Sequence, residues 1–264
     1  MLLTGVASGT QDSGVGVAVE SKWMAAKIFN YAGYCEDTWI IEATQWVMCP
    51  TPVNDLDGVE RCDLGADIVS CSWGGITAKS PDSEQYINAW TKAGMLPVYA
   101  VGNSGPECNS VVAPATIAGV IGVGGTDKYD EVVSWSARGP GPSSASYNIN
   151  TPALVAPGLS IYGPACDDTS SYVGMSGTSQ ATPHVAGVAA LMLSAVPDAS
   201  VEDLTKVLLE TAAKDTLREP SDGQLSCGGK AWNDFESGSN YIYGSGRLDA
   251  LAAVNAFLNH QAKK

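Results

Sequence analysis

Strand-like and helix-like segments alternate along this chain of 264 residues. Apolar runs that suit buried strands lie at 67–73, 95–101 and 120–124. Segments with helical periodicity lie at 38–48, 82–93, 182–195 and 201–212. Glycine- and proline-containing turns separate them, and no linker or internal repeat is visible. This alternation predicts an α/β fold, with a mostly parallel sheet covered by helices on both faces, built as a single domain over residues 1–264.

The sequence also gives predictions for individual segments and helix ends. Lys22–Ile28 is extended in character and could be a strand, and Leu2–Gly9 reads as a short helix of small residues. Pro183 is expected in the first turn of the helix over 182–195, where a missing N–H costs little. Ser200 is the expected N-cap of the helix over 201–212. Residues 215–240 are predicted to form a long surface loop.

The composition limits the classes of partner. The net charge is −14, and both nucleic acid and anionic membranes select basic proteins, so neither is an expected partner. The apolar run at 185–196 is too short to span a bilayer, and residues 1–9 lack the charged and apolar regions of a signal peptide. Seven cysteines without a C-x-x-C pair favour disulfides and an extracellular location over a zinc site. We therefore expect an extracellular location.

A serine stands at the start of the most apolar helix. Residues 176–193 read SGTSQATPHVAGVAALML, which places Ser179 after Gly177 and Thr178. Backbone N–H groups at a helix N-terminus point at developing negative charge, which suits acyl-transfer chemistry. Taken alone, the same serine could be an ordinary N-cap.

An asparagine follows a predicted buried strand in the run VYAVGNSGP at 98–106. Asn103 would then lie at the carboxyl edge of the parallel sheet, where ligand sites of open α/β sheets lie. Its side chain could donate a hydrogen bond to an oxyanion, although a turn-forming Asn beside glycine is an equal alternative.

Together these segments resemble the subtilisin-like serine proteases, or subtilases. Further segments resemble family motifs in the family's order: 67–75, 113–127, 133–140, 154–158 and 244–256. The resemblance implies a secreted monomer that acts on protein or peptide, with Ser179 as the nucleophile and Asn103 as the oxyanion donor. It also implies substrate-binding residues, namely Ser72, Trp73, Gly74, Ala100 and Gly102. Small Ala100 and Gly102, with Trp73 as an aromatic wall, would leave room for a large apolar P1 side chain.

The chain departs from the family where the catalytic Asp and His are expected. No histidine precedes His184, and His260 is the only other one. Residues 1–9 resemble the part of a family helix that follows the catalytic His, so the domain is expected to be incomplete at its N-terminus, without a central strand. His184 lies five residues after Ser179, about 7.5 Å along the helix and rotated by roughly 140°. His260 stands in a polar tail, and loss of the base lowers kcat by about 10⁶-fold.

These departures leave several alternatives open. The chain as given is expected to be inactive and, with unpaired strand edges, poorly soluble or molten. A pseudoprotease that binds peptides is one alternative to the peptidase. A carboxylate-dependent serine peptidase of the sedolisin type is another, although such enzymes carry Asp rather than Asn at the oxyanion position. No cofactor is required for the chemistry, and the resemblance allows a structural calcium ion, for which the sequence assigns no ligands.

Overall fold

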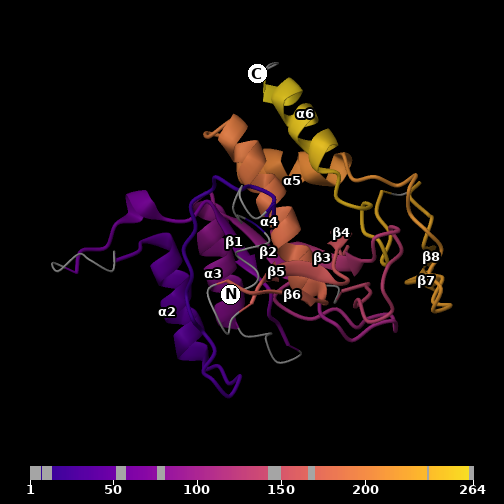
Figure 1. Cartoon of the computed structure of the whole chain (residues 1–264), viewed down its shortest axis with the longest axis horizontal. Coiled ribbons are helices and arrows are strands. Elements are labelled where there is room, and N and C mark those ends of the chain that lie inside the picture. The colour runs from indigo at the N-terminus through magenta and orange to yellow at the C-terminus, as the bar shows by residue number, and fades with distance from the viewer. Residues whose placement is uncertain are drawn as a thin grey trace.

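The computed structural model describes residues 7, 14–51, 58–75, 81–141, 150–165, 170–236 and 238–261. Figure 1 shows its elements in chain order. The helices are α2 (Asp37–Met48), the 3₁₀ helix η1 (Cys62–Leu64), α3 (Pro81–Lys92), α4 (Thr178–Ala195), α5 (Val201–Glu210) and α6 (Ala250–Gln261). The strands are β1 (Ile68–Cys71), β2 (Leu96–Ala100), β3 (Ile121–Thr126), β4 (Leu154–Pro157), β5 (Ile161–Pro164), β6 (Tyr172–Met175), β7 (Ser226–Cys227) and β8 (Lys230–Ala231).

A parallel sheet with the order β1-β2-β3-β4 forms the centre of the molecule. Ser70 of β1 stands opposite Val98 of β2, and Tyr99 of β2 opposite Gly122 of β3. The predicted α/β class is therefore confirmed, and three of the predicted strands are present. β5 pairs antiparallel with β6, and β7 with β8, each as a separate hairpin.

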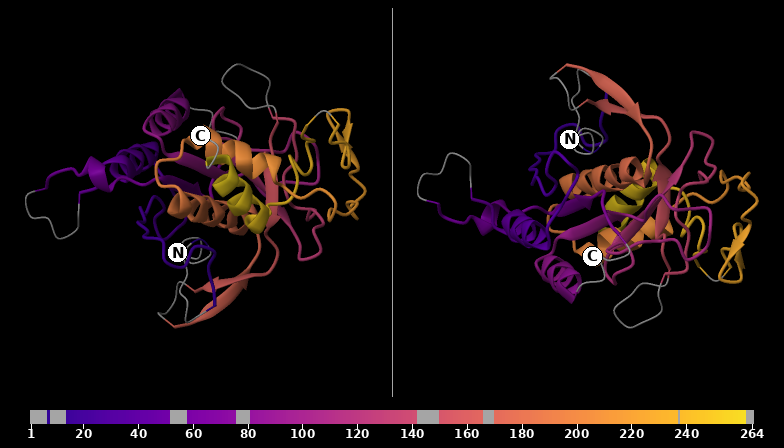
Figure 2. Two further views of the ribbon diagram at one scale, coloured as in Figure 1. Left: turned by 90° about the horizontal axis from the view of Figure 1, so that it is seen from above. Right: turned by 90° about the horizontal axis from the view of Figure 1, so that it is seen from below.

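The two faces of the sheet pack against different helices. On β2, Leu96 and Val98 join a core formed with α4, α5 and α6, whereas Tyr99 joins a second core with α3. All five residues of β2 are buried, as expected for a strand that is covered on both faces. Figure 2 shows α4 and α6 on one side of the sheet and α3 on the other.

The strand predicted at Lys22–Ile28 is wrong. That segment is mostly exposed and has no regular structure, and no strand in the described ranges pairs with it. An extended segment becomes a strand only when a neighbour satisfies its backbone N–H and C=O groups. Among the described strands, β1 is an end strand of the sheet, with only β2 beside it. Extended character in the sequence was therefore not sufficient to predict a strand at this segment.

The helix predicted at 182–195 begins four residues earlier, at Thr178. Pro183 therefore lies in the second turn of α4 rather than in its first, which corrects the prediction. Ser200 caps α5 as predicted, since its Oγ accepts a hydrogen bond from Asp203 N at 3.1 Å. Of the helix predicted at Leu2–Gly9, only Ala7 lies within the described residues. None of the helices in the described ranges has the length and apolar character to cross a membrane.

Candidate active site

The loops at the carboxyl ends of β1 and β2 meet the N-terminus of α4. Ser72 follows β1, Asn103 follows β2, and Ser179 is the second residue of α4. Hydrogen bonds join Ser72 to Ser179 and Asn103 to Thr178, although about 107 and 75 residues separate them in the chain. The fold thus brings together the predicted nucleophile, the predicted oxyanion donor and one predicted substrate-binding residue. Parallel strands make this possible because their carboxyl ends meet at one edge of the sheet.

The side chain of Asn103 is oriented by two donors from Thr178. Both the backbone N and the Oγ1 of Thr178 donate to Asn103 Oδ1 at 2.9 Å. Because Oδ1 is the acceptor for both, Nδ2 is the group that remains to donate elsewhere. A Cβ atom at Gly177 would stand 3.4 Å from Nδ2, so this donor lies beside the entrance to α4. The oxyanion role of Asn103 stays a prediction.

Ser179 forms a reciprocal pair with Ser72. Ser179 Oγ donates to the carbonyl oxygen of Ser72 at 3.1 Å, and Ser72 Oγ donates to the carbonyl oxygen of Ser179 at 2.8 Å. Both side chains are half-buried. A backbone carbonyl accepts a hydrogen bond but does not take the proton near neutral pH. The geometry therefore holds the hydroxyl in place without activating it.

His184 is engaged away from Ser179. Its Nδ1 lies 2.8 Å from the carbonyl oxygen of Gln180, one turn earlier on α4. Burial lowers the pKa of His184, so the ring is neutral near pH 7. The backbone of His260 lies near the end of α6, and its side chain is outside the described residues. Within the described structure, the hydrogen bond of Ser179 Oγ leads to a carbonyl and not to a histidine.

Val112, which the sequence patterns did not identify, lies between the predicted substrate-binding residues Gly74 and Gly102. A Cβ atom on Gly74 would stand 3.0 Å from Val112 Cγ2, and one on Gly102 would stand 3.1 Å from the same methyl group. Gly75 N donates to Ala113 O and Val112 N to Val101 O, both at 3.0 Å, so this segment bridges the loops after β1 and β2. The half-buried Val112 side chain thus occupies space that Gly74 and Gly102 leave open.

Two other predicted pocket residues, Trp73 and Ala100, pack against the interior of the domain. Trp73 packs edge-on against the buried ring of Tyr99, with ring centroids 5.3 Å apart. Ala100 is only 4% exposed and contributes more to the core than to the surface. Their contact with substrate stays a prediction. Gln180, next to Ser179, is also buried, and its Oε1 has no hydrogen-bond partner among the described residues.

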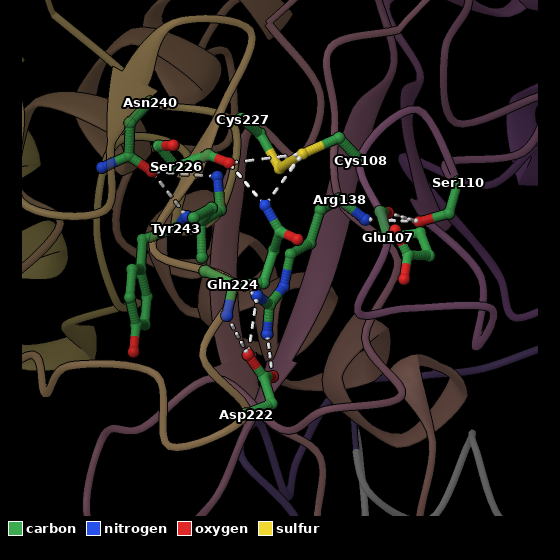
Figure 3. Close-up of a disulfide and its surroundings, with 11 residues drawn as sticks. Glu107, Cys108, Ser110, Arg138, Asp222, Gln224, Ser226, Cys227, Asn240 and Tyr243 are labelled. Atoms are coloured by element: carbon green, nitrogen blue, oxygen red, sulfur yellow. Dashed lines mark hydrogen bonds and ion pairs between the residues drawn. A yellow bond between two sulfur atoms is a disulfide. The ribbon is translucent and has the colours of Figure 1, made fainter.

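A buried polar network holds the loop behind Asn103. Arg138 is fully buried, pairs with Asp222, and donates to the carbonyl oxygen of Gln224 at 2.9 Å. The disulfide Cys108–Cys227 joins the same loop to the hairpin of β7 and β8, as Figure 3 shows. Residues 215–240 are therefore not a plain surface loop, because this segment carries the hairpin and half of the disulfide.

The described part of the chain contains six of the seven cysteines. A second disulfide joins Cys49 and Cys62, and Cys35 and Cys71 are free. Cys166 lies outside the described residues. No group of three His, Cys, Asp or Glu side chains in the described part of the chain could hold a metal ion. The calcium ion that the resemblance allows remains without assigned ligands.

Comparison with known proteins gives the family. The profile described as the Subtilase family matches residues 1–246. Bacillopeptidase F from Bacillus subtilis (strain 168) is 32% identical over 96% of this chain and 16% of its own length. Subtilisin Savinase from Lederbergia lenta is 29% identical over 91% of this chain and 70% of its own length.

Solved structures agree with this result. Sphericase superimposes with a TM-score of 0.73 at 25% identity, over 94% of this chain and 76% of its own.

Serine protease AprX from Bacillus subtilis (strain 168) is 30% identical, and this chain spans 55% of its length. The chain thus spans less than two thirds of the length of Bacillopeptidase F and of AprX. The family profile covers most of this chain. The chain belongs to the subtilase family of serine proteases.

Proposed function

We propose that this chain is the nucleophile-bearing part of a serine endopeptidase that forms an acyl-enzyme on Ser179. The observation that carries the proposal is the link through Thr178, which orients Asn103 beside the residue that precedes Ser179 in sequence. Asn103 Nδ2 would stabilise the oxyanion of the tetrahedral intermediate, together with backbone N–H groups at the start of α4. Residues 1–264 would all belong to one catalytic domain.

The general base is proposed to come from outside residues 1–264. Ser179 Oγ donates to the Ser72 carbonyl, and His184 Nδ1 is bonded to the Gln180 carbonyl. A serine without a base is a weak nucleophile near neutral pH. Residues 1–264 alone are therefore expected to be inactive, and a histidine and an aspartate from another polypeptide segment would complete the site.

The substrate is proposed to be an extended peptide whose backbone pairs with the exposed chain near Ser72 and Gly74. Because Val112 fills the space between Gly74 and Gly102, we expect small P1 side chains. This replaces the sequence-based expectation of a large apolar P1 residue. Two disulfides support an extracellular location, and the net charge of −14 gives no support for binding to nucleic acid or anionic membranes.

Cleavage of a mixed peptide library by residues 1–264, followed by mass spectrometry, tests the proposal. Added imidazole supplies the missing base in solution. We expect no cleavage without imidazole, and cleavage with it that disappears in a Ser179→Ala variant. Cleavage that is equal in the variant would overturn the role of Ser179. Rapid Ser179-dependent cleavage without imidazole would overturn the claim that the base lies elsewhere.

Peptide binding without catalysis is a second candidate function. The reciprocal Ser72–Ser179 pair favours it, because this pair leaves the hydroxyl bonded to a carbonyl. A library that binds with measurable affinity but stays intact at every imidazole concentration would favour this function over the peptidase.

A further inference from the structure

Pro183 removes one hydrogen bond from the turn of α4 that carries Ser179. In an α-helix, the N–H of each residue donates to the carbonyl four residues earlier, so the helical donor for Ser179 would be residue 183. Proline has no N–H, and its ring crowds the same carbonyl. Pro183 lies inside α4, which begins at Thr178. The carbonyl of Ser179 therefore lacks its helical N–H donor.

The hydroxyl of Ser72 takes the place of the missing donor. Ser72 Oγ donates to the Ser179 carbonyl oxygen at 2.8 Å, across 107 residues of sequence. Ser72 is the first residue after β1, so the bond fastens the first turn of α4 to the end of this strand. The hydroxyl of Ser179 reinforces the link, because it donates back to the Ser72 carbonyl at 3.1 Å.

We propose that Ser72 is a positioning residue for the nucleophile, whose hydroxyl replaces the helix hydrogen bond that Pro183 eliminates. The bond holds the backbone of Ser179 at the end of β1, where the proposed peptide groove begins. The hydrogen bond thereby fixes the position of the nucleophile relative to the proposed peptide groove. The inference rests on the proposed role of Ser179, although its test does not require peptidase activity.

A thiol in place of the nucleophile reports this position without a base. In Ser179→Cys, the pH dependence of alkylation by iodoacetamide gives the pKa of the new thiol, and mass spectrometry of peptides separates it from other cysteines. Burial raises the pKa of the free Cys71 to about 12, so that thiol reacts slowly. A well-ordered helix N-terminus lowers the pKa of a thiol at its start.

The expected result is a rise of about 0.5 in the pKa of this thiol when Ser72→Ala is added, because the first turn of α4 loses its fastening. Adding Pro183→Ala should return the pKa to its starting value, since residue 183 then supplies the N–H. Ser72→Thr, which keeps the hydroxyl, should leave the pKa unchanged. Thermal unfolding of each variant verifies that it is folded.

An unchanged thiol pKa in folded Ser72→Ala would overturn the proposal. A raised pKa that Pro183→Ala does not restore would also overturn it, because Ser72 would then act by another route. A lower melting temperature with an unchanged pKa would show a structural role only. Failure of imidazole-dependent cleavage bears on the peptidase proposal alone, because thiol alkylation needs no added base.

Discussion

The two sides of the sheet differ in how completely they are closed. Beyond β4, Tyr243 is buried, its hydroxyl accepts a hydrogen bond from Val132 N at 2.9 Å, and Arg138 and the Cys108–Cys227 disulfide bind the loops together. In the segment that precedes β1 in the sequence, the large side chains of Trp23 and Tyr31 are 59% and 102% exposed. The segment 25–30 and α2 there border a cleft of 630 Å³.

This difference matches the state of the candidate site. Asn103 belongs to the loop after β2, which the Cys108–Cys227 disulfide ties to the closed side, and its side chain accepts hydrogen bonds from Thr178 at the start of α4. The open side is the one without a described strand beside β1. We infer that the closed side preorganises the oxyanion donor, that Ser72 at the end of β1 holds the nucleophile, and that the base belongs with the open side.

The largest expected effect comes from the disulfides. Cys108 and Cys227 are 119 residues apart, whereas Cys49 and Cys62 are 13 apart. Chain entropy alone predicts losses of about 5 and about 3 kcal/mol for the respective double Cys→Ser variants. Urea unfolding of both variants measures the two losses. An equal or larger loss at Cys49 and Cys62 would break the comparison between the two sides.

A somewhat smaller effect is expected at the buried ion pair. Arg138→Met leaves the carboxylate of Asp222 without its main partner in a site that is only 11% exposed, and should lower the free energy of unfolding by about 3–5 kcal/mol. Arg61 forms a similar but exposed pair with Asp63, so Arg61→Met is the matched control, for which we expect little or no loss of stability because solvent screens the pair. Similar losses in the two variants would contradict the claim that the Arg138 network holds the closed side.

The third prediction concerns the size of the pocket. Val112→Gly should remove the methyl groups that stand between Gly74 and Gly102 and so open space for a larger P1 side chain. Affinity for a peptide with Phe at P1, relative to Ala, should rise by about tenfold or more in the variant. Isothermal titration with the two peptides measures the ratio. An unchanged ratio would show that Val112 does not limit the pocket.

The smallest effect is the pH dependence from His184. Burial lowers its pKa in the folded state from the ordinary 6.5, so the unfolded chain takes up the proton first as pH falls. The stability that neutral His184 allows is therefore complete above pH 6.5 and declines below it. His184→Asn should make the free energy of unfolding less dependent on pH between 7.5 and 5.5. A steeper dependence in that variant would contradict the assignment.

Sequence patterns predicted the parts of the fold that depend on local order. The strands around 68–71, 96–100 and 121–126 are buried apolar runs, and burial on both faces of a parallel sheet produces such runs. The cap of α5 at Ser200 is equally local. The place of Asn103 at the carboxyl edge of the sheet followed from the strand and turn pattern, whereas its hydrogen bonds with Thr178 were found only in the structure.

Features that depend on distant partners were missed. Lys22–Ile28 has the character of a strand but no described neighbour to pair with, and α4 begins at Thr178 because contacts with Asn103 organise its first turn. Val112 carries no local signal, since its position between Gly74 and Gly102 depends on how three loops meet. The pairing of Cys108 with Cys227 was also beyond sequence reasoning, because spacing does not determine connectivity.

The most direct test of the account is the rate at which a fluorophosphonate labels Ser179 as imidazole is added to residues 1–264. A preorganised nucleophile without its base predicts negligible labelling at first and a rate that rises in proportion to imidazole. Asn103→Leu should reduce the imidazole-dependent rate by about 10²-fold, because the developing oxyanion loses a donor. Rapid labelling that does not depend on imidazole, or a rate that Asn103→Leu leaves unchanged, would contradict the account.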